Sequence, residues 1–372
     1  MSQSADKTTP ESPPVPPVFL VEMALRLRRF LLRAADAVVP PYVALLDRFF
    51  GAATTMLLHS AAELRIADLL AKDPLTAAEI AARCKTDPAL TERLLRALVG
   101  IGVFARSEDG KYRNNRVAQG LRTGVPGSVR GFVEFFGIPE IVDAWQDLPN
   151  VLRHGGVGFQ RVHGRGVWEW LATSKVGADS FVEGMSSMTE EVSSSIAAAY
   201  PFDEVKKICD VGGGVGIVLA AALRRHPHLS ALLFDEEAML EKAPEHLRKR
   251  GVLDRVELAP GSFFGSIPRG ADAYILKTVL HNWNDEDACT ILRNVRAAME
   301  PGHRLLVADF VGGPDAVTTL IPFMDIAGML IYSGRERTEK EMALLFEATG
   351  FRFRRLIPLP AGQAIFEGIA VA

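Results

Sequence analysis

The chain has 372 residues, of which 48% are hydrophobic and 23% are charged, and its formal net charge is −3. This is the composition of an ordinary soluble globular protein long enough for two domains, and the near-neutral charge argues against a general nucleic-acid binder. The three cysteines (Cys84, Cys209 and Cys289) are far apart and form no Cys-x-x-Cys pair. That spacing disfavours a disulfide framework and a zinc site and favours a reducing cytoplasm.

The N-terminal region predicts a tail followed by a helical arm. Residues 1–18 are rich in proline, serine and threonine, a composition typical of disorder. Residues 19–39 have the pattern of an amphipathic helix, in which arginines interrupt every apolar run that could form a secretory signal or a membrane span. Such an arm could lie on a membrane surface, but we favour packing on a partner subunit.

Residues 41–113 predict three helices and a β-hairpin. Apolar residues recur at helical spacing, and Thr76 with Glu79 three residues later has the pattern of a capping box. An Asp-Gly pair at 109–110 predicts the hairpin turn. The predicted helices are residues 61–70, 77–84 and a third from Asp87 or Thr91 to Gly102, and the hairpin strands are residues 103–106 and 111–113.

Three helices and a hairpin are typical of a winged helix-turn-helix, which leaves two functions open. DNA binding would use the third helix, but Arg93 and Arg96 are its only basic residues and no broad basic stretch surrounds it. We therefore favour a packing module over a DNA-binding regulator.

The rest of the chain predicts a linking region and a parallel sheet. Residues 126–200 are rich in aromatic residues and glycine and predict helices that link the two halves and roof a pocket. The glycines at 155–158 are interpreted as a turn, because no strand precedes them. From residue 201 strands alternate with helices, which predicts a doubly wound parallel sheet. The predicted strands are residues 207–211, 231–234, 255–258, 273–276 and 304–310; the helices are 218–225, 240–250, 286–298 and 339–349; a closing antiparallel hairpin is 351–356 with 363–370.

The first strand of this sheet ends in a glycine turn that predicts a ligand site. Asp210 closes the strand, and residues 212–216 hold four glycines in five positions. Such a turn lets a ligand lie against bare main chain at a helix N-terminus. Ile217 stands where the dinucleotide fingerprint needs a third glycine, and no Lys-Ser/Thr pair follows, so neither a nicotinamide or flavin site nor a P-loop is favoured. A tight turn without a ligand is the alternative.

The later strand ends carry further candidate residues. Asp235 ends the second strand, where an acid can accept hydrogen bonds from a ribose diol; an ordinary surface aspartate is the alternative. Ser262 and Phe263 follow the third strand, where they could contact an adenine ring. His281 lies just beyond the fourth strand, and because imidazole titrates near neutrality this placement predicts a general base. Asp285 is a candidate cap of the next helix.

Five motifs occur in one order and spacing: Asp-Val-Gly-Gly-Gly-Val-Gly at 210–216, Asp235, Gly-Ser-Phe-Phe at 261–264, Leu-Lys-Thr-Val-Leu-His-Asn-Trp-Asn-Asp-Glu-Asp at 276–287, and Gly-Arg-Glu-Arg-Thr at 334–338. As a set they resemble the metal-independent, S-adenosylmethionine-dependent O-methyltransferases, which include plant phenylpropanoid and flavonoid enzymes and bacterial enzymes that tailor polyketides. The likeness covers about residues 45–370.

The resemblance implies a C-terminal Rossmann-like methyltransferase sheet with an N-terminal helical winged-helix dimerisation domain. It implies a homodimer, S-adenosylmethionine as the cofactor and no metal. The implied reaction is methylation of a phenolic or enolic hydroxyl on a small aromatic or polyketide-like metabolite. We expect a tail at 1–18, a dimerisation domain at 19–125, linking helices at 126–200 and a catalytic domain at 201–372.

Site residues follow from the same resemblance. His281 matches the general base, and Asp309 and Glu336 match two acids that flank it. The implied cofactor-binding residues are Asp210, Gly212, Gly214, Asp235, Ser262, Phe263, Lys277 and Trp283. The implied substrate-binding residues are Met185, Met188, Phe323, Met324 and Met329, although methionine and aromatic residues at such spacing are also typical of an ordinary core.

Three positions depart from the family pattern, in which Asp is usual at Ser262, Glu at Asp309 and Asp at Asn282. Ser262 removes one adenine-side acid, and Asp309 is one methylene shorter, so it is expected to hold the His281 ring less firmly. Two other functions stay open. Some relatives bind S-adenosylmethionine but act as hydroxylases, decarboxylases or cyclases, against which His281 and its two acids argue. A DNA-binding regulator that uses residues 60–115 is the second.

Overall fold

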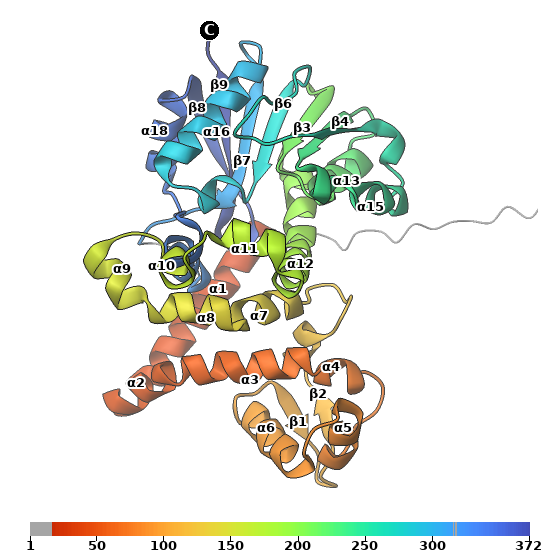
Figure 1. The fold of residues 1–372 in the computed structure, drawn as a ribbon, viewed down its shortest axis with the longest axis vertical. Coiled ribbons are helices and arrows are strands. Elements are labelled where there is room, and N and C mark those ends of the chain that lie inside the picture. Colours follow the sequence, from red (N-terminus) through yellow and green to blue (C-terminus); the bar gives the residue numbers. More distant parts are fainter. Residues whose placement is uncertain (1–16, 315, 317) are drawn as a thin grey trace, which may run out of the picture.

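The computed structural model describes residues 17–314, 316 and 318–372. The tail predicted at 1–18 therefore lies almost entirely outside the described residues. N-terminal helices occupy one end of the molecule, a large sheet occupies the other, and a layer of helices lies between them (Figure 1). Within the described part of the chain, no helix is long and apolar enough to cross a membrane.

The N-terminal part consists of helices followed by a two-stranded hairpin, as predicted. Thr76 and Glu79 form the expected capping box: the Thr76 N–H donates to the Glu79 carboxylate over 2.7 Å, and the Glu79 N–H donates to Thr76 Oγ1 over 3.3 Å. Asp87 caps the third predicted helix. The elements are α1 (Val18–Ala37), α2 (Pro41–Phe49), α3 (Gly51–Glu63), α4 (Ile66–Leu69), α5 (Ala77–Cys84), α6 (Pro88–Gly100), β1 (Phe104–Arg106), β2 (Tyr112–Asn114) and η1 (Ala118–Leu121).

Two helices predicted as continuous are broken. The helix predicted at 61–70 is interrupted at Arg65, whose φ of +51° lies in the left-handed region and separates α3 from α4. The helix predicted at 240–250 is divided into α14 (Glu237–Leu240) and α15 (Ala243–Lys249). Pro244 lies in the first turn of α15, where its missing N–H costs no helical hydrogen bond but prevents α14 from continuing through it.

A layer of helices joins the two ends. Its longest member, α12, packs against α7 in the layer and against α13 beside the sheet. Phe135, Phe159 and Trp170 form an apolar core with residues of η4, so this layer is tied to a segment nearly 200 residues later in the chain. The elements are α7 (Arg130–Gly137), α8 (Pro139–Gln146), α9 (Leu148–His154), α10 (Gly158–His163), α11 (Val167–Thr173), α12 (Lys175–Ala199), α17 (Leu320–Ala327) and η4 (Gly328–Tyr332).

The sheet has seven strands in the order β5-β4-β3-β6-β7-β9-β8. The first five are parallel, and β9 pairs antiparallel with both β7 and β8. The strands are β3 (Lys207–Val211), β4 (Ser230–Asp235), β5 (Val256–Pro260), β6 (Ala273–Lys277), β7 (Arg304–Phe310), β8 (Phe351–Pro358) and β9 (Gln363–Ala370). This confirms the predicted doubly wound sheet and its closing hairpin.

Helices cover both faces of the sheet and form two apolar cores. One core lies against α16 and α18 and the other against α12, α13 and α15. The prediction that Asp285 caps α16 is wrong: the Asn284 side chain accepts from the Asp287 N–H over 2.9 Å, and Asp285 is the first helical residue. The remaining elements are α13 (Ile217–Arg225), η2 (Leu253–Arg255), η3 (Leu280–Asn282), α16 (Asp285–Ala298), α18 (Glu339–Glu347) and η5 (Pro360–Gly362).

Candidate active site

The predicted site residues gather at the carboxyl ends of three neighbouring strands. Strand order reverses at β3, since β4 lies on one side of it and β6 on the other, and open parallel sheets bind ligands at such a switch point. Asp210, Lys277 and Asp309 lie at the ends of β3, β6 and β7. His281 follows on η3.

The glycine turn offers bare main chain to a ligand. Gly212 has a φ of +73°, and a Cβ atom there would lie 3.0 Å from the Val279 side chain and 3.6 Å from the Phe263 ring. Both the conformation and the space therefore require glycine. The Gly214 N–H donates to Asp235 Oδ2 over 2.7 Å, which places the predicted ribose-binding acid directly against the turn.

Asp235 is held firmly by main chain. Its Oδ1 accepts from the Glu236 N–H over 2.7 Å, while Oδ2 accepts from Gly214. Burial raises the pKa of Asp235, and these two N–H groups oppose that rise by stabilising the carboxylate. Each oxygen keeps a further lone pair, so the carboxylate can still accept hydrogen bonds from a bound ligand.

Asp210 and Lys277 form a second polar part of the site. Asp210 is buried, and its Oδ2 has no hydrogen-bond partner among the described residues. Burial, together with the negative charge of Asp235, raises the pKa of Asp210 to about 7, whereas burial lowers the pKa of Lys277 to about 8. An unpartnered carboxylate near a partly desolvated ammonium fits the amino and carboxylate groups of an amino-acid moiety such as that of S-adenosylmethionine.

Thr189, which the sequence analysis missed, connects this region to α12. Lys277 Nζ donates to Thr189 Oγ1 over 2.6 Å, and the Thr189 hydroxyl donates to the Met185 carbonyl over 2.6 Å. A threonine inside a helix gives no local signal for such a role, because its partner lies 88 residues away. Met185, a predicted substrate-binding residue, thus lies one helical turn from the Lys277 contact.

Aromatic rings form one wall of the site. Phe263 meets the edge of Trp283 with ring centres 5.9 Å apart, and Trp283 stacks on Trp168 of α11 with centres 6.0 Å apart. Ser262 lies beside this wall, and its hydroxyl accepts from the Phe264 N–H over 3.4 Å. The predicted adenine-side residues therefore lie together, with an aromatic link to the middle helices.

His281 and Glu336 form a buried pair. His281 Nδ1 lies 2.9 Å from Glu336 Oε1, and both side chains are largely buried. Burial opposes the charged imidazolium, but the charges of Glu336 and Asp309 outweigh it and raise the pKa of His281. With Glu336 as the acceptor, the neutral ring carries its proton on Nδ1 and leaves Nε2 free to accept one.

Asp309 approaches His281 without a hydrogen bond. Both of its carboxyl oxygens are buried with no hydrogen-bond partner among the described residues. Burial raises the pKa of Asp309 to about 7, although the nearby His281 and Lys277 charges favour its ionised form. This fits the expectation that the short aspartate holds the ring less firmly than Glu336 does.

Other residues support the pair from behind. Asp325 Oδ1 on α17 accepts from the Glu336 N–H over 2.8 Å, and Arg337 donates to the main chain on both sides of His281. Thr278, between Lys277 and His281, has a φ of +50°, which is unusual for a β-branched residue and turns the chain out of β6. Periodicity and residue type do not reveal such contacts.

The predicted substrate-binding residues are less closely grouped. Met185 and Met188 lie on α12, but the side chain of Met188 lies outside what the structure describes. Phe323 and Met324 lie on α17; the Phe323 side chain is 63% exposed and does not form a closed wall in a single chain. Met329 on η4 packs against the apolar core of the middle helices.

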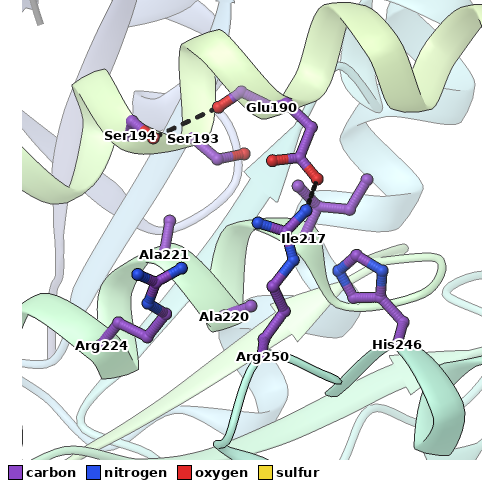
Figure 2. Close-up of a pocket in the computed structure, with 9 residues that line it drawn as sticks. All are labelled: Glu190, Ser193, Ser194, Ile217, Ala220, Ala221, Arg224, His246 and Arg250. Atoms are coloured by element: carbon purple, nitrogen blue, oxygen red, sulfur yellow. Dashed lines mark hydrogen bonds and ion pairs between the residues drawn. The ribbon is translucent and has the colours of Figure 1, made fainter. Parts of the chain in front are cut away.

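Two cavities lie apart from these residues. Figure 2 shows one of about 20 Å³ between α12, α13 and α15, closed by the Glu190–Arg250 ion pair. It has room for about one water, and two buried polar atoms at its wall, Ser193 Oγ and His246 Nε2, have no partner among the described residues. Another cavity of about 380 Å³ lies between α1 and the ends of β7, β8 and β9. Neither is lined by a predicted site residue.

No group of three or more His, Cys, Asp or Glu side chains in the described ranges is arranged to hold a metal ion. The cysteines within those ranges are unpaired.

Comparison with known proteins identifies the family. Residues 145–352 match the model of the O-methyltransferase domain, and residues 46–123 match that of the O-methyltransferase dimerisation domain. A phenazine O-methyltransferase of Lysobacter antibioticus is 33% identical over 88% of this chain and 96% of its own length. An aclacinomycin 10-hydroxylase of Streptomyces purpurascens is 36% identical over 88% of this chain and 90% of its own length.

A solved structure adds the cofactor. NcsB1, an O-methyltransferase from neocarzinostatin biosynthesis in complex with S-adenosylmethionine, superposes with a TM-score of 0.75 at 31% identity, over 86% of this chain and 96% of that chain. The glycine turn, Asp235 and the Asp210–Lys277 region described above fit the same cofactor. The chain therefore belongs to the O-methyltransferase family and is an S-adenosylmethionine-dependent O-methyltransferase.

Proposed function

We propose that the enzyme methylates a phenolic or enolic hydroxyl of a small aromatic or polyketide-like metabolite, with His281 as the general base. The observation that carries this proposal is the buried His281–Glu336 pair, 2.9 Å apart, beyond the carboxyl end of β6. Three of the four bacterial relatives and structures with named aromatic targets bear names that refer to phenazine, naphthoate or naphthoic acid. They support an aromatic acceptor here.

The proposed chemistry assigns a role to each nitrogen of the ring. A phenol has a pKa of about 10 and is mostly protonated at neutral pH, so its oxygen needs a base. Nδ1 of His281 donates to Glu336, which leaves Nε2 to accept the hydroxyl proton. The bound cofactor supplies a methyl group that is already activated on a sulfonium. The chain then has to orient the oxygen toward that methyl and exclude water.

The cofactor-binding roles are proposed in the same way. Asp235 would bind the ribose hydroxyls, and Gly212 and Gly214 would lie against the methionine part with Asp210 and Lys277. Ser262, Phe263 and Trp283 would enclose the adenine. We also propose the domain division at residues 19–125, 126–200 and 201–372, and an acceptor site lined by Met185, Met188, Phe323, Met324 and Met329.

A second candidate is non-methylating chemistry, because one relative at 36% identity is named a hydroxylase. A third relative is named an N,N-dimethyltransferase, which suggests an amine acceptor as a variant. The decisive test is incubation with methyl-labelled S-adenosylmethionine and a matched panel of phenols, naphthols and the corresponding anilines. Label on a phenolic oxygen supports the proposal. Label on nitrogen alone, or a changed acceptor with no label, overturns it.

Glu336→Gln is expected to shift the pH dependence of the reaction. The Glu336 charge raises the pKa of His281, so its loss lowers that pKa, and the neutral base persists to lower pH. The acidic limb of the kcat/KM profile, expected above the ordinary histidine value of about 6.5, should move downward. The plateau should also fall, by part of the roughly 10²–10⁴-fold that general-base catalysis contributes. An acidic limb that stays in place in the variant would contradict this role.

Ser262→Asp is expected to tighten cofactor binding. Family members usually carry an acid here, and a carboxylate can accept from an adenine amino group or ribose hydroxyl more strongly than a hydroxyl does. One such charge-assisted bond corresponds to about 1.5–3 kcal/mol, or roughly a 10–100-fold lower Kd. Calorimetry with S-adenosylhomocysteine measures it, with Ser266→Asp, four residues further on, as the control. An unchanged or weaker Kd in the Ser262 variant would remove Ser262 from the proposed site.

We also propose a homodimer built on the N-terminal helices. No residue of α1 is buried in a single chain, although the helix and its successor α2 carry many large apolar side chains. Apolar surface of this extent indicates an interface. The exposed residues are Phe19, Leu20, Met23, Leu27, Phe30, Leu31, Leu32, Tyr42, Leu45, Leu46, Phe49 and Phe50.

Light scattering is expected to give the mass of two chains for the wild type and of one chain for a Leu27→Glu, Phe30→Glu double variant. Each introduced carboxylate would have to be buried without a partner at the interface. Arg33→Glu changes charge on the same helix without removing an apolar contact and should leave a dimer. A double variant that keeps the dimer mass would exclude this face.

A further inference from the structure

We propose that Arg337 is a positioning residue that clamps the main chain on both sides of His281 and so sets the reach of the base toward the acceptor. The proposal rests on the proposed role of His281. Neither residue type nor motif position assigned a role to Arg337.

Arg337 is 3% exposed and contacts the two ends of the segment that carries the histidine. Its Nη1 donates to the Leu280 carbonyl over 2.9 Å, and its Nη2 donates to the Trp283 carbonyl over 2.9 Å. His281 and Asn282 lie between these two carbonyls, in the single turn η3. The guanidinium therefore spans the residue whose position matters most.

The charge of Arg337 is balanced at the next helix. Nε and Nη2 donate to Asp285 Oδ1 over 2.9 and 2.7 Å, so the side chain makes four hydrogen bonds within one planar group. A guanidinium can satisfy such divergent acceptors at once because its donors are fixed in a fork, whereas a lysine ammonium is a single point. The clamp thus depends on arginine in particular.

Glu336 and Arg337 act on the same histidine in complementary ways. Glu336 holds the ring at Nδ1, and the adjacent Arg337 holds the main chain from which the ring projects. Behind them Gly334 closes the space, since a Cβ atom there would lie 1.9 Å from the His281 carbonyl oxygen. One short segment therefore fixes both the ring and its backbone without slack.

This matters because proton transfer and methyl transfer depend on distance. Reacting atoms must approach to about 3–3.5 Å, and a misplacement of about 1 Å costs roughly 10²-fold in rate. Loss of the Arg337 contacts frees the η3 carbonyls and lets the His281 ring leave Glu336. The expected loss is therefore in kcat, with cofactor binding at Asp235 and the glycine turn retained.

Arg335 provides a matched control. It belongs to the same segment and also pairs with Asp285, over 3.5 Å to Oδ2, but its side chain is 44% exposed and it contacts no η3 carbonyl among the described residues. Arg335→Ala thus removes an arginine and a contact to the same carboxylate, without the clamp. A purely structural role for arginine at Asp285 would affect both variants.

The first measurement compares Arg337→Ala, Arg337→Lys and Arg335→Ala with the best acceptor of the phenol panel. We expect kcat to fall about 100-fold in Arg337→Ala and about 10-fold or more in Arg337→Lys, with KM for S-adenosylmethionine within twofold. Arg335→Ala should stay within twofold of wild type in both constants. Added guanidinium should restore part of the kcat of Arg337→Ala by entering the vacated space.

The second measurement needs no turnover. NMR titration of carbon-13-labelled histidine, with the His281 signal assigned from a His281→Ala sample, reports how closely the ring stays with Glu336. Glu336, Asp309 and Lys277 are the charged groups that face the ring. Withdrawal from Glu336 should lower the pKa of His281 in both Arg337 variants and leave it unchanged in Arg335→Ala.

Three results would overturn the proposal: wild-type kcat in Arg337→Ala, an unchanged His281 titration in both Arg337 variants, or equal losses in Arg335→Ala. If Arg337→Ala does not fold, Arg337→Lys carries both measurements. Failure of the proposed function is distinguishable, because it appears as full activity in His281→Ala, while the titration still tests whether Arg337 positions the ring.

Discussion

Replacing His281 with alanine is expected to lower kcat by about 10²–10⁴-fold at neutral pH, the contribution of a positioned general base. Without the ring, no group at Nε2 can take the acceptor proton, and the phenol stays protonated. The KM for S-adenosylmethionine should change little, since the proposed cofactor contacts lie on β3, β4 and the glycine turn. Initial rates against both substrates measure the effect.

The same variant has an internal control in the acidity of the acceptor. A nitro-substituted phenol that is ionised at the assay pH needs no base, so its methylation should lose much less than that of the parent phenol. His303→Ala, a substitution of the same kind at the other end of β7, should be near wild type. Full methylation of the parent phenol by His281→Ala would end the general-base proposal.

Asp235→Ala is expected to raise the Kd for S-adenosylhomocysteine by roughly 10–100-fold. The carboxylate accepts from the Gly214 and Glu236 N–H groups, so its removal loosens the glycine turn and also removes the proposed ribose contact. A hydrogen bond to a charged group corresponds to about 1.5–3 kcal/mol, which spans this range. Calorimetry measures the Kd, and kcat at saturating cofactor should fall far less.

Asp235→Asn separates the two contributions. Its amide oxygen can still accept one N–H, but its amino group cannot accept the other, so an intermediate Kd is expected. An alanine variant with wild-type affinity would show that the Asp235 carboxylate serves the turn alone and binds no ligand.

The regular elements and the glycine turn were predictable because their signals are local. The strand Lys207–Val211, the capping box at Thr76 and the hairpin after Gly102 were predicted from neighbouring residues, and the structure has them. The break at Arg65 was not predictable in this way, because a non-glycine residue in the left-handed region carries no sequence signal.

The supporting residues of the site were missed for a different reason. Thr189 meets Lys277 across 88 residues, and Arg337 meets Leu280 across 57. Such contacts depend on how the middle helices and the segment after η4 pack on the sheet, which periodicity does not encode. Resemblance supplied His281 and Glu336, since both lie within recognisable motifs, but it supplied no partner for either at atomic detail.

The position of β9 has a consequence for how the molecule is assembled. Gln363–Ala370 is the last strand along the chain, yet it lies inside the sheet, between β7 and β8. Strand β7, which bears Asp309, therefore keeps an open edge until nearly the whole chain has been synthesised, and contacts of this sequence separation close slowly. A ribosome-bound chain that ends before residue 363 would expose that edge to pairing with other chains, so the catalytic strand is also the strand most in need of protection during synthesis.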